Sequence, residues 1–119
     1  ERDFEDSLKP ALEQNGLCEL PYFGLAKGFL TGKYQPGTSI ESVRASGVTA
    51  YQNERGWALL GKLDELAQEH QTSLSAISLA WLRAQPTVAA PIASARNLDQ
   101  LKEIMPVITL TEEELGRLT

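Results

Sequence analysis

The chain has 119 residues, 42% of them hydrophobic and 23% charged, and eleven Lys+Arg against sixteen Asp+Glu give a net charge of −5. This composition is typical of one small folded domain, or of part of a larger one, and is too apolar for a disordered chain. The acidic balance argues against nucleic acid and against an anionic membrane surface as partners, because both attract basic surfaces.

Cysteine content and apolar runs indicate the cellular compartment of the chain. The single cysteine, Cys18, cannot form an internal disulfide, which favours the reducing cytoplasm. No apolar run approaches the about 20 residues that a membrane-spanning helix needs. The chain opens on Glu-Arg-Asp without an initiator Met or a signal-peptide pattern, so we expect it to be a piece of something longer.

The first half of the chain predicts a helix, a strand and a long loop. Residues 3–15 have apolar side chains at helical spacing, and Gly16 stands where a left-handed C-cap belongs. Residues 17–22 are mostly apolar and predict a short strand. Residues 23–52 hold five glycines and predict a long loop, with one helical turn near 25–30. Loops of this length inside compact domains are usually functional or disordered.

The second half predicts four helices and one strand. Residues 53–70 form an amphipathic helix, and residues 74–84 form a helix so apolar that we expect it to be deeply buried. Residues 88–93 are small and apolar, which predicts a strand covered on both faces. Residues 97–105 predict a short helix, and the last helix begins at Thr111 with a capping-box pattern.

Strands separated by helices indicate an α/β fold built of parallel βα units. Two strands do not make a stable parallel sheet. We therefore expect the missing strands to come from another chain, from another copy of this one, or from a segment outside this sequence.

The segment 22–33, YFGLAKGFLTGK, is the first candidate for chemistry. It begins where the first predicted strand ends, which is where α/β folds bind their ligands. Its three glycines permit close approach of the backbone, whose N–H groups can donate to phosphate oxygens, and Lys33 adds a positive charge. A Walker A loop is excluded because Tyr34 stands where Ser or Thr is required. The alternative is an ordinary glycine-rich loop with a solvated lysine.

The segment 91–100, PIASARNLDQ, is the second candidate. A predicted strand ends and a helix begins near Asn97, so Ser94 and Arg96 stand where a phosphate would bind. Arginine can hold phosphate with two hydrogen bonds. The alternative is that Asn97 and Gln100 only cap the helix. In a parallel barrel both candidates would lie on one rim, and together they predict a dinucleotide site.

Several stretches of the chain resemble the aldo-keto reductase family. Residues 21–34 look like the family segment after barrel strand seven. The family's stretch into strand eight is similar to residues 78–82, 85–86 and 90–96, and its closing segment is similar to residues 110–115. The resemblance covers nearly the whole chain. It implies that residues 1–119 are the C-terminal portion of a single (β/α)8 TIM barrel domain, from the helix after strand six onward. It also implies reduction of an aldehyde or ketone by hydride transfer from NADPH.

The resemblance further implies a cofactor site within this chain, in which residues 23–52 form the cofactor loop. Tyr22 stacks on the nicotinamide, Lys33 sits close to the phosphates, and Arg44 loosely matches an arginine of the cofactor loop. By the same resemblance, Leu25 and Gly28 would line the pyrophosphate, together with the neighbouring backbone of Phe23, Gly24 and Ala26. The adenosine 2′-phosphate and ribose are surrounded by Ser94, Arg96, Gln100 and Glu103, with Arg96 favouring NADPH over NADH.

The chain departs from the family pattern in three ways. Ile104 stands beside the adenine where many members have Asn, and Phe23-Gly24 stands where many have Ser-Pro. No residue matches the family's catalytic Asp, Tyr, Lys and His, so the chain acting alone should not catalyse hydride transfer, and no metal site is expected.

The expected partners are a carbonyl substrate and the N-terminal part of the same barrel or another chain. The alternatives are a non-catalytic NADPH-binding module and a structural half-barrel fragment. Because a half-barrel exposes sheet edges and apolar helix faces, we expect the isolated chain to self-associate.

Overall fold

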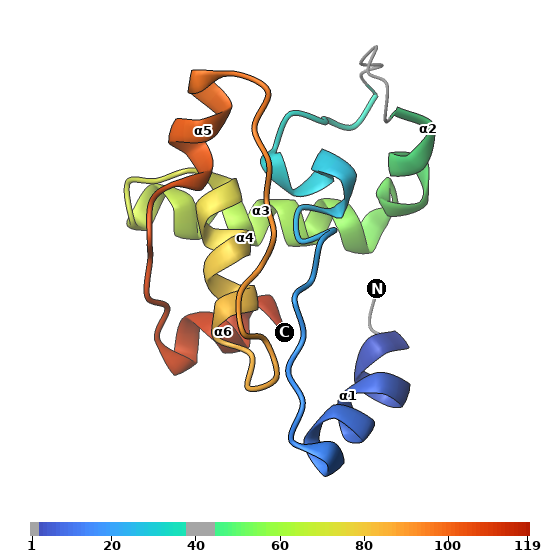
Figure 1. Cartoon of the computed structure of the whole chain (residues 1–119). Helices are drawn as coiled ribbons and strands as arrows, with labels where there is room; N and C mark the ends of the chain where they lie inside the picture. Colours follow the sequence, from blue (N-terminus) through green and yellow to red (C-terminus); the bar gives the residue numbers. More distant parts are fainter. Residues whose placement is uncertain (1–2, 38–44) are drawn as a thin grey trace.

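The computed structural model describes residues 3–37 and 45–119 (Figure 1). Helix α4 packs against α3, α5 and the 3₁₀ helix η1, whereas α1 lies to one side of the other helices. The helices are α1 (Asp3–Asn15), η1 (Ala26–Thr31), α2 (Ala45–Val48), η2 (Thr49–Tyr51), α3 (Glu54–Glu69), α4 (Leu74–Arg83), α5 (Leu98–Ile104) and α6 (Glu112–Leu118). The five helices predicted from the sequence are therefore confirmed, with boundaries that shift by a residue or two.

The helix starts follow from side-chain caps. Asn53, Ser73, Asn97 and Thr111 each accept a hydrogen bond from the backbone N–H three residues further on. At Thr111 the predicted capping box is present in both directions, because the Glu114 side chain accepts from the Thr111 N–H. Such caps satisfy donors that the first helical turn leaves free, which is why these boundaries could be predicted.

The two predicted strands are wrong for the described part of the chain, which contains no strand. Residues 17–22 and 88–93 run side by side (Figure 1), joined by a single parallel bridge between Glu19 and Val88. The Glu19 N–H donates to the carbonyl of Thr87 at 2.8 Å. Parallel pairing of the expected segments is thus present, but only over one rung of a ladder.

Two prolines explain why the ladder stops. After the Ala89 N–H donates to the Glu19 carbonyl at 3.0 Å, the next rung would need N–H groups from Pro21 and Pro91, and proline has none. The Ile92 N–H donates to the Pro21 carbonyl instead, at 2.9 Å, one residue out of register. The apolar runs by themselves predict strands, but the two prolines remove N–H donors that a longer ladder needs.

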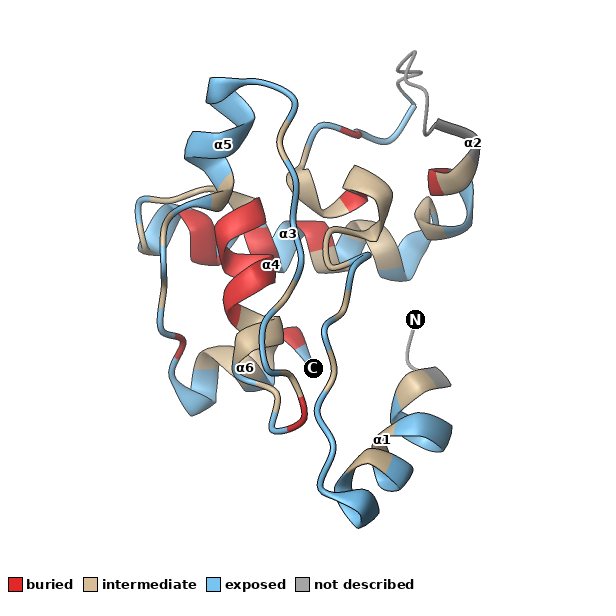
Figure 2. Ribbon diagram, in the orientation of Figure 1, coloured by how far each residue is buried: buried red, intermediate tan, exposed pale blue. Residues whose placement is uncertain are grey.

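The core lies between α3 and α4 (Figure 2). All six residues of 75–80 are buried, which confirms the expectation of a deeply buried helix. Helix α3 contributes the predicted apolar stripe, in which Leu60, Leu63, Leu66 and Ala67 are buried. None of the helices in the described residues combines the length and apolar character that crossing a bilayer requires.

The described part of the predicted loop 23–52 contains more helix than the sequence suggests. It contains η1, at the helical turn expected near 25–30, and also α2 and η2. Phe29, which is only 1% exposed, holds η1 against the rest of the molecule. Its ring centroid lies 5.3 Å from that of Trp57 on α3, and the rings of Tyr51 and Tyr34 follow at 5.9 and 6.4 Å.

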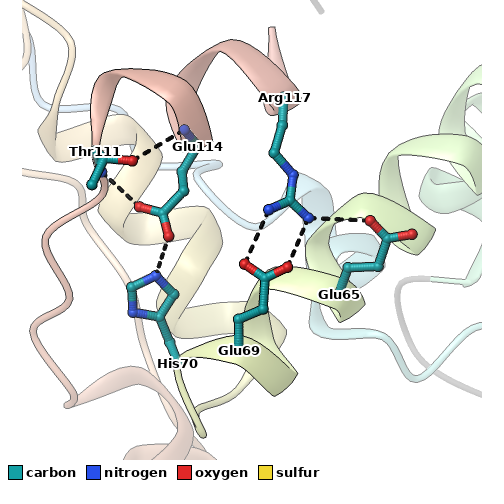
Figure 3. A network of polar contacts seen from close by, with 6 residues as sticks. All are labelled: Glu65, Glu69, His70, Thr111, Glu114 and Arg117. Atoms are coloured by element: carbon teal, nitrogen blue, oxygen red, sulfur yellow. Dashed lines mark hydrogen bonds and ion pairs between the residues drawn. The ribbon is translucent and has the colours of Figure 1, made fainter.

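A polar network joins α6 to the C-terminal end of α3 (Figure 3). The Arg117 guanidinium donates to both carboxylate oxygens of Glu69 at 3.0 Å and to Glu65 at 3.2 Å. Beside it, Nε2 of His70 lies 2.6 Å from Oε1 of Glu114. His70 is the C-cap of α3, so the sole histidine of the chain has a structural position.

The Glu114 carboxylate is held in its charged form. Its second oxygen accepts the Thr111 N–H at 2.7 Å, and this bond, followed by the contact with His70, lowers its pKa from 4.5 to about 2. The group therefore stabilises the fold above its unfolded pKa, and this contribution is lost as the pH falls from about 4.5 towards 2.

Replacement of Glu114 by Gln tests this contribution. We expect Glu114→Gln to lower the free energy of unfolding by about 1 kcal/mol at pH 7, since a charged acceptor is lost. The difference from the wild type should shrink below pH 4.5, as the wild-type carboxylate takes up a proton. Urea unfolding between pH 2 and 7 measures this, with Glu113→Gln, an exposed neighbour, as the control. A difference that does not change with pH would contradict the assignment.

Exposed apolar side chains give a second prediction. Ten large hydrophobic residues in the described part of the chain are exposed: Leu8, Leu17, Leu20, Tyr22, Phe23, Ile92, Leu98, Leu101, Met105 and Val107. Because four of them, Leu17, Leu20, Tyr22 and Ile92, lie in the two paired segments, we expect the isolated chain to self-associate. Sedimentation velocity over a range of concentrations checks this, and a monodisperse 13.0 kDa monomer would show it to be wrong.

Candidate functional site

A cavity of about 520 Å³ lies where the two predicted site segments meet. This volume is in the range of small-molecule sites. One wall comes from residues 22–33, the other from residues 92–104, and α4 adds a single residue between them. The lining residues are Tyr22, Phe23, Leu25, Lys27, Gly28, Thr31, Gly32, Lys33, Ser75, Ile92, Ala93, Ser94, Arg96, Gln100, Glu103 and Ile104.

The first wall has an unusual backbone. Ala26, Lys27 and Gly28 follow one another with φ of 47°, 59° and 95°, in the left-handed region that non-glycine residues rarely occupy. Strain of this kind persists where packing over-determines the chain, and it concentrates at functional sites. A Cβ at Gly28 would lie 3.3 Å from Nζ of Lys33, so a bare backbone here leaves room for that ammonium group.

Lys27 is the cation that the sequence analysis missed. Its Nζ lies 5.6 Å from the ring centroid of Phe23, and its side chain passes so close to α2 that a Cβ at Gly47 would lie 2.8 Å from Cδ. The only signal in the sequence was a lysine next to a glycine of the loop. That signal did not distinguish Lys27 from a solvated surface lysine, whereas its place in the strained turn does.

The second wall is held by caps. Oδ1 of Asn97 accepts the Gln100 N–H at 2.9 Å, and Oε1 of Gln100 accepts the Arg96 N–H at 2.9 Å. The amide oxygen of Gln100 therefore acts as a cap, as the alternative predicts. The two N–H donors of its NH₂ group are not used in this cap. The Arg96 side chain is exposed, and it forms no ion pair with the described residues.

The cavity carries positive charge in an acidic chain. Lys27, Lys33 and Arg96 line it, and among the described lining residues Glu103 is the only carboxylate. The chain as a whole carries −5. Three cations facing one carboxylate in a concave surface attract anions, and this attraction weakens with added salt.

Nine of the twelve predicted site residues line this cavity: Tyr22, Phe23, Leu25, Gly28, Lys33, Ser94, Arg96, Gln100 and Glu103. Gly24 and Ala26 border a second, more apolar cavity of about 450 Å³. A Cβ at Gly24 would lie 2.8 Å from Cδ1 of Leu82, so this glycine allows the loop to pack on α4 rather than a ligand to approach. Arg44 lies outside the described residues.

Several lining residues were not predicted as site residues. Thr31, Ser75, Ile92 and Ala93 belong to this group, together with Gly32 and Lys27, whereas Ile104 is the residue that the family resemblance puts beside the adenine. Most are small or apolar and therefore resemble core residues in the sequence. Ser75 lies in a helix between the two walls, and only the packing of that helix brings it to the cavity.

Comparison with known proteins finds one protein family that matches the full length of the chain. The sequence model of the Aldo/keto reductase family matches residues 1–119. Protein tas of Escherichia coli K12 is 33% identical over 85% of this chain and 30% of its own length, and L-glyceraldehyde 3-phosphate reductase of Escherichia coli O157:H7 is 28% identical over 96% and 36%. The chain thus spans about a third of the length of these relatives.

A solved structure agrees at the level of the fold. The glycerol dehydrogenase AKR11B4 from Gluconobacter oxydans matches 99% of this chain with a TM-score of 0.76, at 24% sequence identity. The match covers 38% of that protein. The helices and the paired segments of this chain are therefore arranged like the matching part of that larger protein.

Two glycines of the first loop offer a matched test of the wall. Gly32 and Gly37 have nearly equal φ, 79° and 78°, but a Cβ at Gly32 would lie 2.9 Å from Cδ2 of Leu74, whereas none of the described atoms lies within 4 Å at Gly37. We expect Gly37→Ala to cost about 1 kcal/mol of unfolding free energy through the backbone alone. Gly32→Ala should cost about 1 kcal/mol more, because Leu74 must move. Equal losses in urea unfolding would mean that α4 is not packed on this wall.

Proposed function

Because the chain belongs to the aldo-keto reductase family, we propose that it supplies the NADPH-binding part of an enzyme that reduces an aldehyde or ketone. The observation that carries the proposal is the shared cavity, in which two segments about 70 residues apart contribute three cations. Neither segment forms such a site alone. In this proposal the paired segments 17–22 and 88–93 correspond to strands seven and eight of a (β/α)8 barrel.

The residues present fit a dinucleotide phosphate. Lys33 lies over the bare backbone of Gly28, and Lys27 lies on the same wall, which suits the pyrophosphate. Arg96 on the opposite wall forms no ion pair with the described residues, and its guanidinium can hold a 2′-phosphate with two hydrogen bonds. Its neighbours Gln100 and Glu103 offer a donor and an acceptor to the ribose.

The aromatic pair at the mouth suits the nicotinamide end. Tyr22 is 68% exposed, and its ring centroid lies 4.0 Å from that of Phe23. This contact steadies the Tyr22 ring, whose free face can stack on a planar ring. When bound, NADPH supplies the hydride for the reduction, and the residues of this chain bind and orient it.

The rest of the machinery is expected from a partner. No residue of this chain matches the family's catalytic Asp, Tyr, Lys and His, so we expect cofactor binding without turnover by this chain alone. The N-terminal part of the same barrel, or another chain, would supply the proton donor and much of the carbonyl pocket. We expect the assembled protein to act in the cytoplasm. A structural half-barrel without NADPH affinity is the alternative that the following experiment distinguishes.

Arg96→Ala tests the proposal most directly. Calorimetric titration of the full chain should show saturable binding with NADPH preferred over NADH. The substitution should weaken NADPH binding at least tenfold, since a charge-assisted bidentate contact contributes about 1.5–3 kcal/mol. NADH binding should change less than about twofold, because only NADPH carries the 2′-phosphate.

Arg55→Ala is the matched control, because Arg55 is exposed on α3 and lines neither cavity. It should leave both affinities unchanged. Equal weakening of NADPH and NADH by Arg96→Ala would remove Arg96 from the 2′-phosphate. Absence of NADPH binding by the folded wild type would favour the structural alternative.

A further inference from the structure

The second cavity, of about 450 Å³, differs from the first in the sign of its charge. It lies between α1, the segment 17–22 and the helices α3 and α4, all of which contribute to its lining. Among the described residues that line it, only Glu5 and Glu19 are charged. A cavity of this volume can hold a small molecule, and one lined by carboxylates disfavours anions. The two neighbouring cavities therefore suit ligands of opposite charge.

Glu19 is the unusual member of this lining. Its backbone is fixed on both sides, because its N–H donates to the Thr87 carbonyl at 2.8 Å and its carbonyl accepts the Ala89 N–H at 3.0 Å. Its side chain is half-buried, and Oε1 accepts a hydrogen bond from Oγ1 of Thr87 at 3.1 Å. Within the part of the chain that the structure describes, Glu19 forms no ion pair. A half-buried carboxylate that lacks a cation is costly, and a bound cation would remove that cost.

Aromatic side chains supply much of the remaining lining. Trp81 comes from α4, Tyr51 from η2 and Phe4 from α1, while Phe23 lines both cavities. The faces of aromatic rings carry partial negative charge and attract ammonium groups. Phe23 already attracts one, since Nζ of Lys27 lies 5.6 Å from its ring centroid. The walls of the second cavity thus suit a cation with an apolar body.

We propose that the second cavity binds a small organic cation, a protonated amine with an apolar body about the size of one ring. The ammonium group pairs with the Glu19 carboxylate, and the apolar body lies against Trp81 and Leu63. A metal ion is a poorer ligand, because the described ranges contain no group of three His, Cys, Asp or Glu side chains that could hold one. A neutral apolar molecule would leave Glu19 without a cation. This inference goes beyond the proposed function and does not depend on NADPH binding.

Two ligands of similar shape and different charge test the proposal. Calorimetric titrations of the full chain at pH 7 compare 2-phenylethylammonium, which is protonated at this pH, with the neutral 2-phenylethanol. We expect the ammonium ligand to bind at least about fivefold more tightly, because only it pairs with a carboxylate. Added sodium chloride should weaken binding of the ammonium ligand and leave that of the alcohol unchanged.

Glu19→Gln and Glu13→Gln form a matched pair, because each removes one negative charge from the same acidic chain. Glu13 is exposed on α1 and lines neither cavity. Glu19→Gln keeps an oxygen that can accept from Thr87 but offers no charge to an ammonium group. We expect it to weaken 2-phenylethylammonium at least about fivefold and 2-phenylethanol less than about twofold. Glu13→Gln should leave both affinities unchanged.

The two tryptophans of the chain report where the ligand binds. Trp81 lines the second cavity, whereas Trp57 lines neither cavity and packs on Phe29. In the ¹H–¹⁵N spectrum we expect 2-phenylethylammonium to shift the indole N–H signal of Trp81 and to leave that of Trp57 in place. Arg96→Ala, which changes only the first cavity, should not alter this response.

Several outcomes would overturn the proposal. Equal affinity for the two ligands would show a plain apolar cavity, and unchanged binding of the ammonium ligand by Glu19→Gln would remove Glu19 from the site. A shift of the Trp57 signal alone would place the ligand elsewhere. Should Glu19→Gln not fold, the comparison of the two ligands and its salt dependence in the wild type decide the matter. Failure of the chain to bind NADPH would overturn the proposed function and leave this inference standing.

Discussion

The ring of Phe29 sets the position of the whole candidate site. It is surrounded by the rings of Tyr34, Tyr51 and Trp57, which come from the following turn, from η2 and from α3. Aromatic clusters of this kind combine a large buried area with preferred ring geometries. Because η1 is held at Phe29, the strained turn within it, just before Phe29, has a defined place, and Lys27 and Lys33 line the cavity.

Helix α4 joins that anchored wall to the second one. Its apolar surface is buried against α3, while its first turn contacts Gly32 on one side and the carbonyl of Glu103 on the other. The cavity therefore exists only while the core is packed. Its charge is opposite to that of the chain, since Lys27, Lys33 and Arg96 gather there in a protein of net charge −5. Local convergence of cations, and not composition, makes it attractive to anions.

Helix ends could be predicted from the sequence, but strands could not. A cap such as Ser73 or Asn97 acts on N–H groups three residues away, so its signal is local and easily read. Pairing between the segments around Glu19 and Val88 depends on donors from both, and Pro21 and Pro91 remove them together. The family resemblance correctly predicted that these segments lie side by side. Hydropathy predicted a longer series of backbone hydrogen bonds between them than the structure contains.

The sequence by itself determined the helices, the amphipathic face of α3, the two segments at the candidate site and the family, because each depends on spacing within a short stretch. Only the tertiary structure decided that Lys27 and Ser75 line the cavity, that Gly24 serves packing on Leu82, and that the ladder ends after one rung. Those outcomes depend on contacts between residues far apart in the sequence, such as Gly24 with Leu82 and Glu19 with Val88. Such contacts are set by how α4 is buried, which local spacing does not encode.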